Sequence, residues 1–238
     1  MGVQVWDELY SHAVSTAETQ VVEAAVVETA VTEAPVQEEN IVHAEAVDST
    51  PMPDVLSSSW PELQSMVQQC SQCDLHSSRT QVVFGAGNQN ARLLLVGEAP
   101  KQDEEEQGMP FVGEAGDLLT AMLKAIDLQR EDVYITNIVK CRPAENRHPQ
   151  PAELDACHQY LHRQIALLQP KVIFAIGAMA SQTLLKSSKN IGVLRGQAHN
   201  FEGIPLVASF HPAYLLRKPS EKRKAWQDLL QVKSLLVE

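Results

Sequence analysis

The sequence predicts an α/β domain of three layers, α/β/α, in which helices cover both faces of a central four-stranded parallel sheet. Two observations carry this prediction. Four short apolar runs alternate along the chain with amphipathic helical segments, as in folds built from strand–helix–strand units. Each run is apolar nearly throughout, as strands buried on both faces are. The runs are 93–96, 133–135, 171–176 and 205–209.

Charge divides the chain into two parts. Residues 1–54 contain eleven acidic residues and no Lys or Arg, so this segment accounts for the whole net charge of -11. The other residues balance, with 30 - 11 = 19 acids against 19 Lys plus Arg. We therefore predict a disordered acidic extension at 1–54 and one folded domain at 55–238, and a nucleic-acid partner for that domain is not excluded. Within the extension, 1–14 is interpreted as an ordinary terminus in preference to a docking peptide.

No targeting or membrane segment is evident in the sequence. The first residues lack a basic stretch followed by an apolar one, and no apolar run reaches the length of a membrane span. We therefore expect a cytoplasmic protein that does not contact membranes and acts as a monomer. The partner of the acidic extension is not indicated.

The first helix of the folded part leads into a pair of cysteines, Cys70 and Cys73. Two cysteines three positions apart can share a metal but are strained as a mutual disulfide. The only other cysteines are Cys141 and Cys157. In a chain expected to be cytoplasmic, four cysteines favour a metal site over two disulfides, with four ordinary buried cysteines as the alternative. Four thiolates suit zinc or an iron–sulfur cluster, and the spacing does not separate the two.

The run 93–96 ends at Gly97-Glu98-Ala99-Pro100 and continues as a loop rich in carboxylates. Glu98 comes directly after the strand, and the ligand crevice of an open parallel sheet lies beyond the carboxyl ends of its strands. Phe111 follows a proline within this polar loop, a poor place for an ordinary core residue, so a flat ligand stacked on it is one explanation. A loop anchored by a single buried Phe is the alternative.

The other elements follow the same alternation of strand and helix. Two further polar residues, Asn137 and His211, come at strand ends, and His211 is followed by an apolar pair expected to be exposed, Leu215 and Leu216. A basic turn at 139–143 surrounds the third cysteine. Helices are predicted at 114–126, 151–168, 177–186 and 220–236, and a hairpin-like stretch begins at 195.

Together these strand-end residues describe a pocket for a planar heterocycle. A carboxylate (Glu98), an amide that can donate and accept in one plane (Asn137), an imidazole (His211) and an aromatic plate (Phe111) suit a ligand with amide-like edges, such as a nucleobase. Taken singly, each is more often a satisfied loop residue. Their joint occurrence, at three strand ends and in one adjoining loop, favours a shared site.

Several motifs resemble those of the family 4 uracil-DNA glycosylases. They are 97–100 (GEAP), 108–113 (GMPFVG), Asn137 with 140–143 (KCRP), 211–217 (HPAYLLR) and the four cysteines. The resemblance covers about residues 60–236. It implies an α/β/α fold, hydrolysis of the N-glycosidic bond of deoxyuridine in DNA during base excision repair, and a 4Fe-4S cluster.

The resemblance also implies a role for each matching residue. Glu98 would orient or activate the attacking water, and His211 would donate to the carbonyl that gains charge. The expected uracil contacts are the Ala99 backbone, Phe111 stacked on the base, Asn137 at its amide edge and Glu104 near the position of a thymine methyl. The expected cluster ligands are Cys70, Cys73, Cys141 and Cys157. Leu215 or Leu216 would enter the space left by a flipped nucleotide, with Arg217 on a phosphate.

One residue departs from the family pattern. Lys101 stands where glycine is usual, and it could pair with Asp103, contact a phosphate or hinder the approach of the loop to DNA. No Arg-rich insertion is present between 194 and 209, so turnover is expected instead of covalent trapping. Two alternatives stay open: a non-catalytic DNA-binding iron–sulfur module of the same fold, and a zinc-stabilised nucleotide-binding protein.

Overall fold

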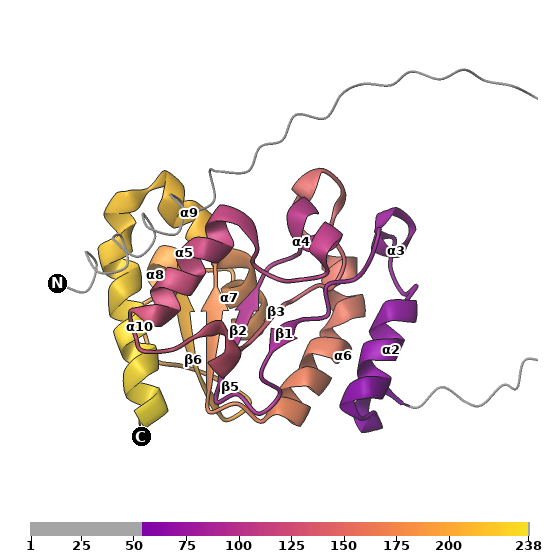
Figure 1. The fold of residues 1–238 in the computed structure, drawn as a ribbon, viewed down its shortest axis with the longest axis horizontal. Coiled ribbons are helices and arrows are strands. Elements are labelled where there is room, and N and C mark those ends of the chain that lie inside the picture. The colour runs from indigo at the N-terminus through magenta and orange to yellow at the C-terminus, as the bar shows by residue number, and fades with distance from the viewer. Residues whose placement is uncertain (1–53, 238) are drawn as a thin grey trace, which may run out of the picture.

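The computed structural model describes residues 54–237 (Figure 1). The extension predicted to be disordered, 1–54, lies outside the described residues except for Asp54. The Asp54 carboxylate accepts a hydrogen bond of 3.3 Å from the Leu56 amide and caps a single helical turn, η1 (Val55–Ser57). The first described residue thus belongs to the folded part, one position before the predicted boundary.

The sheet has six strands in the order β1-β3-β2-β4-β6-β5 and is mixed. The four central strands pair in parallel, and a short strand pairs antiparallel at each edge. The prediction of a central four-stranded parallel sheet is therefore corrected to a mixed sheet of six strands. The edge strand β1 has two residues and is too short to stand out in the sequence, whereas β5 lies in the stretch predicted to be hairpin-like and pairs antiparallel with β6. The bounds are β1 (Ala86–Gly87), β2 (Leu93–Gly97), β3 (Tyr134–Asn137), β4 (Val172–Ile176), β5 (His199–Phe201) and β6 (Ile204–Ser209).

Helices cover both faces of this sheet (Figure 1). On one face α5 and α10 pack against apolar side chains of the central strands, and on the other α6 and α7 do so, with α2 packed on the outside of α6. No helix within residues 54–237 is both long and apolar enough to cross a membrane. The helices and single turns are α2 (Trp60–Gln69), α3 (Leu75–Ser78), α4 (Gln102–Gln107), α5 (Gly113–Lys124), η2 (Arg130–Asp132), η3 (Ala144–Asn146), α6 (Pro151–Leu168), α7 (Ala178–Leu185), α8 (Ile191–Leu194), α9 (Pro212–Arg217), η4 (Pro219–Glu221) and α10 (Lys222–Val237).

Strand register brings the polar strand ends to one edge of the sheet. Gly97 pairs with Asn137 across β2 and β3, and Ile176 pairs with Ser209 across β4 and β6. Because these strands run parallel, their carboxyl ends and the loops that follow them lie on the same side. The segment after β2 was predicted to be a loop, but part of it is helical. Its acidic residues form α4, which ends at Gly108 in the left-handed conformation (φ 67°).

The prediction that Leu215 and Leu216 are both exposed is wrong. Leu215 is 0% exposed within the core, and Leu216 is partly buried against it, because α9 turns one side of its short helix inward. Lys140, in the basic turn that surrounds the third cysteine, is 1% exposed. Its ammonium donates to the Thr136 hydroxyl, the Asn137 carbonyl and the Gln164 side chain, each at 2.7 Å. Lys140 therefore ties the end of β3 to α6 and is not available to a phosphate.

Candidate active site and four-cysteine pocket

Two adjoining cavities lie at the carboxyl edge of the sheet. A recess of about 40 Å³ and a wider groove of about 540 Å³ share Ala99, Lys101 and His211 in their linings. The recess also contains the other predicted base contacts, Glu104, Phe111 and Asn137. The groove contains Glu98 and Arg217, together with Asn146 and His148. The predicted residues thus gather at one place, with Glu98 on the groove side; neither lining includes Leu215 or Leu216.

Phe111 forms a wall of the recess and belongs to the core at the same time. It is 3% exposed, and its ring stacks on the His211 ring with centroids 5.4 Å apart. Gly97 makes this packing possible: a Cβ there would lie 2.7 Å from the Phe111 ring and 2.3 Å from Asn137 Oδ1. Gly97 is therefore the residue that lets the aromatic plate and the amide approach each other.

A clamp of two side chains, Glu104 and Arg130, holds the backbone at Phe111. Glu104 Oε1 accepts from the Phe111 amide at 2.5 Å, and Oε2 accepts from the Lys101 amide at 2.7 Å. Arg130 donates to the carbonyls of Phe111 (3.1 Å) and Pro110 (2.8 Å). Phe111 has φ 54°, a conformation that costs a residue other than glycine free energy. The clamp therefore maintains a strained loop conformation.

Burial affects both members of the clamp. It raises the pKa of the Glu104 carboxyl, against the opposing effect of its backbone donors, and lowers the pKa of the Arg130 guanidinium. Sequence reasoning missed Arg130, which is 19 residues from Phe111 and lies in a single turn before β3. No local pattern marks it.

Asn137 leaves one hydrogen-bonding group unused. The residue is 1% exposed, and its Nδ2 has no hydrogen-bond partner among residues 54–237. A buried amide group without a partner costs free energy, and such groups are rare in native proteins. Because Asn137 lines the recess, this donor is available to an acceptor on a bound ligand.

His211 is poised as a neutral donor. Its Nδ1 accepts a 3.1 Å hydrogen bond from the Ala213 amide at the start of α9. Burial lowers the pKa of His211 to about 4, and the positive charges of Lys101 and Arg217 act in the same direction. A neutral imidazole that accepts at Nδ1 carries its proton on Nε2. The structure thus offers an N–H donor at neutral pH without a positive charge.

Glu98 has a partner that sequence reasoning did not single out. His148 Nδ1 lies 2.5 Å from Glu98 Oε1, across 50 positions of the chain. The signal for His148 was limited to its place in a polar loop after the third cysteine. Lys101 lies exposed where the recess and the groove meet.

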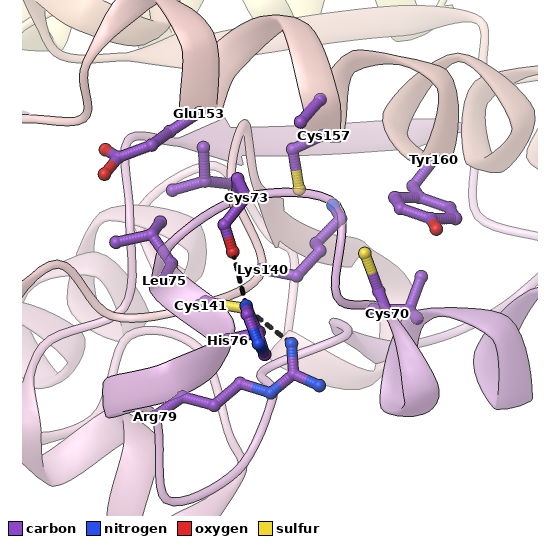
Figure 2. Close-up of a pocket in the computed structure, with 13 residues that line it drawn as sticks. Cys70, Cys73, Leu75, His76, Arg79, Lys140, Cys141, Glu153, Cys157 and Tyr160 are labelled. Carbon is purple, nitrogen blue, oxygen red and sulfur yellow. Dashed lines mark hydrogen bonds between the residues drawn. The ribbon is translucent and has the colours of Figure 1, made fainter.

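The four cysteines line a second pocket, apart from these cavities (Figure 2). Cys70 and Cys73 come from the connection between α2 and α3, Cys141 follows β3, and Cys157 lies on α6. Arg79 donates to Cys141 Sγ at 3.2 Å. Burial raises the pKa of the Cys73 and Cys141 thiols and raises that of Cys157 to about 12. Such thiols stay protonated unless a cation or a metal centre binds them.

The donor set of this pocket fits a soft metal or a metal cluster. Four thiols from three separate segments line it, and thiolates are the ligands that such metals prefer. Among residues 54–237, no group of three or more His, Cys, Asp or Glu residues is placed to hold one metal ion. Zinc binds four thiolate sulfurs at about 2.3 Å, and in a 4Fe-4S cluster each of four cysteine sulfurs binds one iron, so the donor set by itself suits both groups.

Fold and cavities together define an α/β protein that can hold a flat ligand with amide-like edges at the carboxyl edge of its sheet. Residues 84–230 match the family model described as the uracil DNA glycosylase superfamily. The chain belongs to this superfamily, and within it to the type-4 uracil-DNA glycosylases.

Curated relatives agree with this assignment. The chain is 43% identical over 174 residues to a type-4 uracil-DNA glycosylase of Thermotoga maritima, covering 91% of that protein and 71% of this chain. It is 40% identical over 177 residues to the type-4 enzyme of Archaeoglobus fulgidus, covering 89% of that protein and 71% of this chain. A type-5 uracil-DNA glycosylase of Pyrobaculum aerophilum is 31% identical over 146 residues, covering 64% of that protein and 54% of this chain.

Proposed function

We propose that this chain is a DNA repair enzyme that hydrolyses the N-glycosidic bond of deoxyuridine in DNA, releasing uracil and leaving an abasic site. The observation that carries the proposal is the buried Asn137 Nδ2 without a partner, which lines a recess together with Phe111 and a neutral His211. Relatives described as type-4 uracil-DNA glycosylases support it.

Base selection rests on the two sides of the Asn137 amide. Its NH₂ donates to the uracil carbonyl at position 4, and its oxygen accepts from the N3–H. Cytosine presents the reverse pattern and leaves both groups unpaired, at about 1–3 kcal/mol each. Phe111 stacks on the ring, and the Ala99 backbone contacts its edge. Because both Glu104 oxygens bind backbone amides, the main role assigned to Glu104 is to hold the backbone at Phe111, which stacks on the base, and not to crowd a thymine methyl.

Bond cleavage divides the charge between base and sugar. The C1′–N1 bond breaks with its electron pair going to the uracil ring, and a water oxygen forms the new bond to C1′. The His211 Nε2–H donates to the carbonyl that gains negative charge. Glu98 orients this water, accepts its proton and stabilises the positive charge on the sugar. A preorganised donor of this kind lowers an activation barrier by about 3 kcal/mol.

DNA occupies the groove next to the recess. The target nucleotide is turned out of the duplex, because its glycosidic bond cannot be reached inside the base stack. Arg217, which is exposed at the groove, contacts a phosphate. Of the two leucines expected to fill the vacated space, Leu216 is the candidate, since Leu215 is 0% exposed in the core. The protein acts as a cytoplasmic monomer.

Cys70, Cys73, Cys141 and Cys157 hold a 4Fe-4S cluster with a structural role. In that state the four cysteines would bind as thiolates, each releasing its thiol proton, and would tie the α2–α3 connection to the segment after β3 and to α6. Replacing Cys73 with Ser is expected to give insoluble or colourless protein. Soluble, coloured and fully active Cys73→Ser protein would contradict a structural cluster, and colourless native protein with bound zinc would favour the zinc alternative.

The function is tested by uracil release from single- and double-stranded oligonucleotides under single-turnover conditions. Matched oligonucleotides with cytosine or thymine at the same position serve as controls. Release of free uracil, with release from the other two slower by several orders of magnitude, is the expected result. Tight binding without release would favour a non-catalytic DNA-binding module.

A further inference from the structure

Glu98 has one side-chain partner in the part of the chain that the structure describes. His148 Nδ1 lies 2.5 Å from Glu98 Oε1, and no other hydrogen bond or ion pair of this carboxylate is recorded within residues 54–237. The Glu98 side chain is 26% exposed. One carboxylate oxygen is therefore held, while the other has no protein partner and is free to contact a water molecule.

The backbone at His148 is anchored although its side chain is 78% exposed. Arg147 binds both oxygens of Glu153 at 2.6 and 2.9 Å, and the same guanidinium donates to the His148 carbonyl at 3.0 Å. Glu153 also accepts from the Gln150 amide at 2.8 Å, at the start of α6. These contacts fix the chain on both sides of His148. The imidazole therefore projects from a supported segment.

His148 also lies where it can act on the reaction. It lines the same groove as Glu98 and His211. A partly exposed carboxylate such as that of Glu98 samples several rotamers, and ordering it costs free energy. A partner that holds one oxygen removes part of that cost before DNA binds. When DNA covers the groove and excludes water, the interaction between the two side chains strengthens.

We propose that His148 is a positioning residue for uracil excision, which holds Glu98 Oε1 so that Oε2 faces the attacking water. The proposal rests on the proposed function. In the reaction, the water oxygen bonds to C1′, the C1′–N1 bond breaks with its electron pair on uracil, and the water proton passes to Glu98 Oε2. His148 exchanges no proton with the substrate and acts only through Glu98.

The test is a double-mutant cycle measured by single-turnover uracil release. His148→Ala removes the contact, and His148→Asn keeps an N–H donor near the position of Nδ1. Both changes are made in the parent protein and in the Glu98→Gln variant. The dissociation constant for DNA with an uncleavable deoxyuridine analogue is measured in parallel. His158→Ala is the control for loss of an exposed histidine, since His158 lies on α6 and does not line the groove.

We expect His148→Ala to slow excision about tenfold with an unchanged dissociation constant, and His148→Asn to restore the rate to within about threefold of the parent. In the Glu98→Gln background, His148→Ala should have no further effect, and His158→Ala should match the parent. The proposal is overturned if His148→Ala leaves the rate unchanged or acts only on DNA affinity. The proposal is also overturned if His148→Asn excises uracil as slowly as His148→Ala. This comparison does not use the Glu98→Gln background, so it can be made even if that variant is too slow to measure.

The two proposals fail in different ways. If the parent protein releases no uracil, the proposed function is wrong. If the parent releases uracil and His148→Ala does so equally well, only the positioning role of His148 is wrong. If His148→Ala slows uracil release equally in the Glu98→Gln background, His148 acts through a contact with DNA and not through Glu98.

Discussion

Replacing Glu104 with Gln distinguishes two roles for this side chain. The family resemblance predicts that Glu104 crowds the methyl of thymine. In the structure the carboxylate accepts from the amides of Phe111 and Lys101 and is 8% exposed. Gln keeps the shape but offers one acceptor, so its NH₂ must face one of the two backbone N–H groups. If the clamp is the main role, Glu104→Gln harms the handling of uracil itself.

The magnitude follows from the contacts that are lost. A hydrogen bond to a carboxylate contributes about 1.5–3 kcal/mol, and Phe111, at φ 54°, holds about 1–3 kcal/mol of backbone strain that the clamp opposes. Part of this lost free energy is regained, because burying the neutral Gln amide costs less than burying the Glu104 carboxylate, whose pKa burial already raises. A net effect of about 1–2 kcal/mol slows uracil release about 5- to 30-fold.

The assay is single-turnover release from matched uracil and thymine oligonucleotides, with urea unfolding to measure stability. Glu106→Gln is the control, since Glu106 lies exposed on the same helix α4. We expect slower uracil release, lower stability and no gain on thymine for Glu104→Gln. An unchanged uracil rate together with new activity on thymine would refute the clamp and restore the role implied by the resemblance.

Three further predictions follow. Asn137→Asp should lose most activity on uracil, because the pattern of donors and acceptors at the amide edge changes, and single-turnover release measures this. The free energy of unfolding should fall as the pH decreases from 6.5 to about 4. The pKa of His211 is lowered in the folded protein, so the unfolded chain binds a proton at this histidine first, and the loss of stability from this group is at most about 3 kcal/mol. Deleting residues 1–53, which removes ten acids and no Lys or Arg, should leave uracil release intact and tighten binding to non-specific DNA at low salt.

Each of these predictions has a result that contradicts it. Uracil release by Asn137→Asp at the parent rate would remove this residue as the reader of the base edge. Equal acid sensitivity of His211→Asn and the parent, compared by urea unfolding at pH 7.5 and 5, would show that His211 is not the linked group. Loss of folding after deletion of 1–53 would mean that the domain boundary is misplaced.

Long elements with a strong pattern could be predicted closely from the sequence. The helix at 151–168 has the predicted bounds, and each of the four central strands overlaps its apolar run. Runs of this kind are unambiguous because both faces of the strand are buried. Two short elements were missed, α4, which consists of polar residues, and the two-residue strand β1; β5 was indicated only as part of a hairpin-like stretch. Their conformation depends on contacts with distant parts of the chain, which a local pattern does not contain.

Some residues of the candidate site could likewise be predicted from the sequence, and others could not. Glu98, Asn137 and His211 could be found because strand ends in an α/β order are visible in the sequence, and parallel register then brings them together. The four cysteines could likewise be recognised as one donor set. Residue type and spacing along the chain were sufficient for these predictions, because they depend on local elements and on a common topology.

Tertiary structure alone decided how the site is supported. His148 meets Glu98 across 50 positions, and Arg130 reaches the carbonyl of Phe111 across 19. Leu215 turns into the core while Leu216 stays near the surface. Hydrophobic periodicity indicates which side of an element is apolar, but not which polar groups from separate loops will satisfy each other once the layers pack. That pairing is set by the three-dimensional arrangement, because buried donors and acceptors must find partners wherever the fold places them.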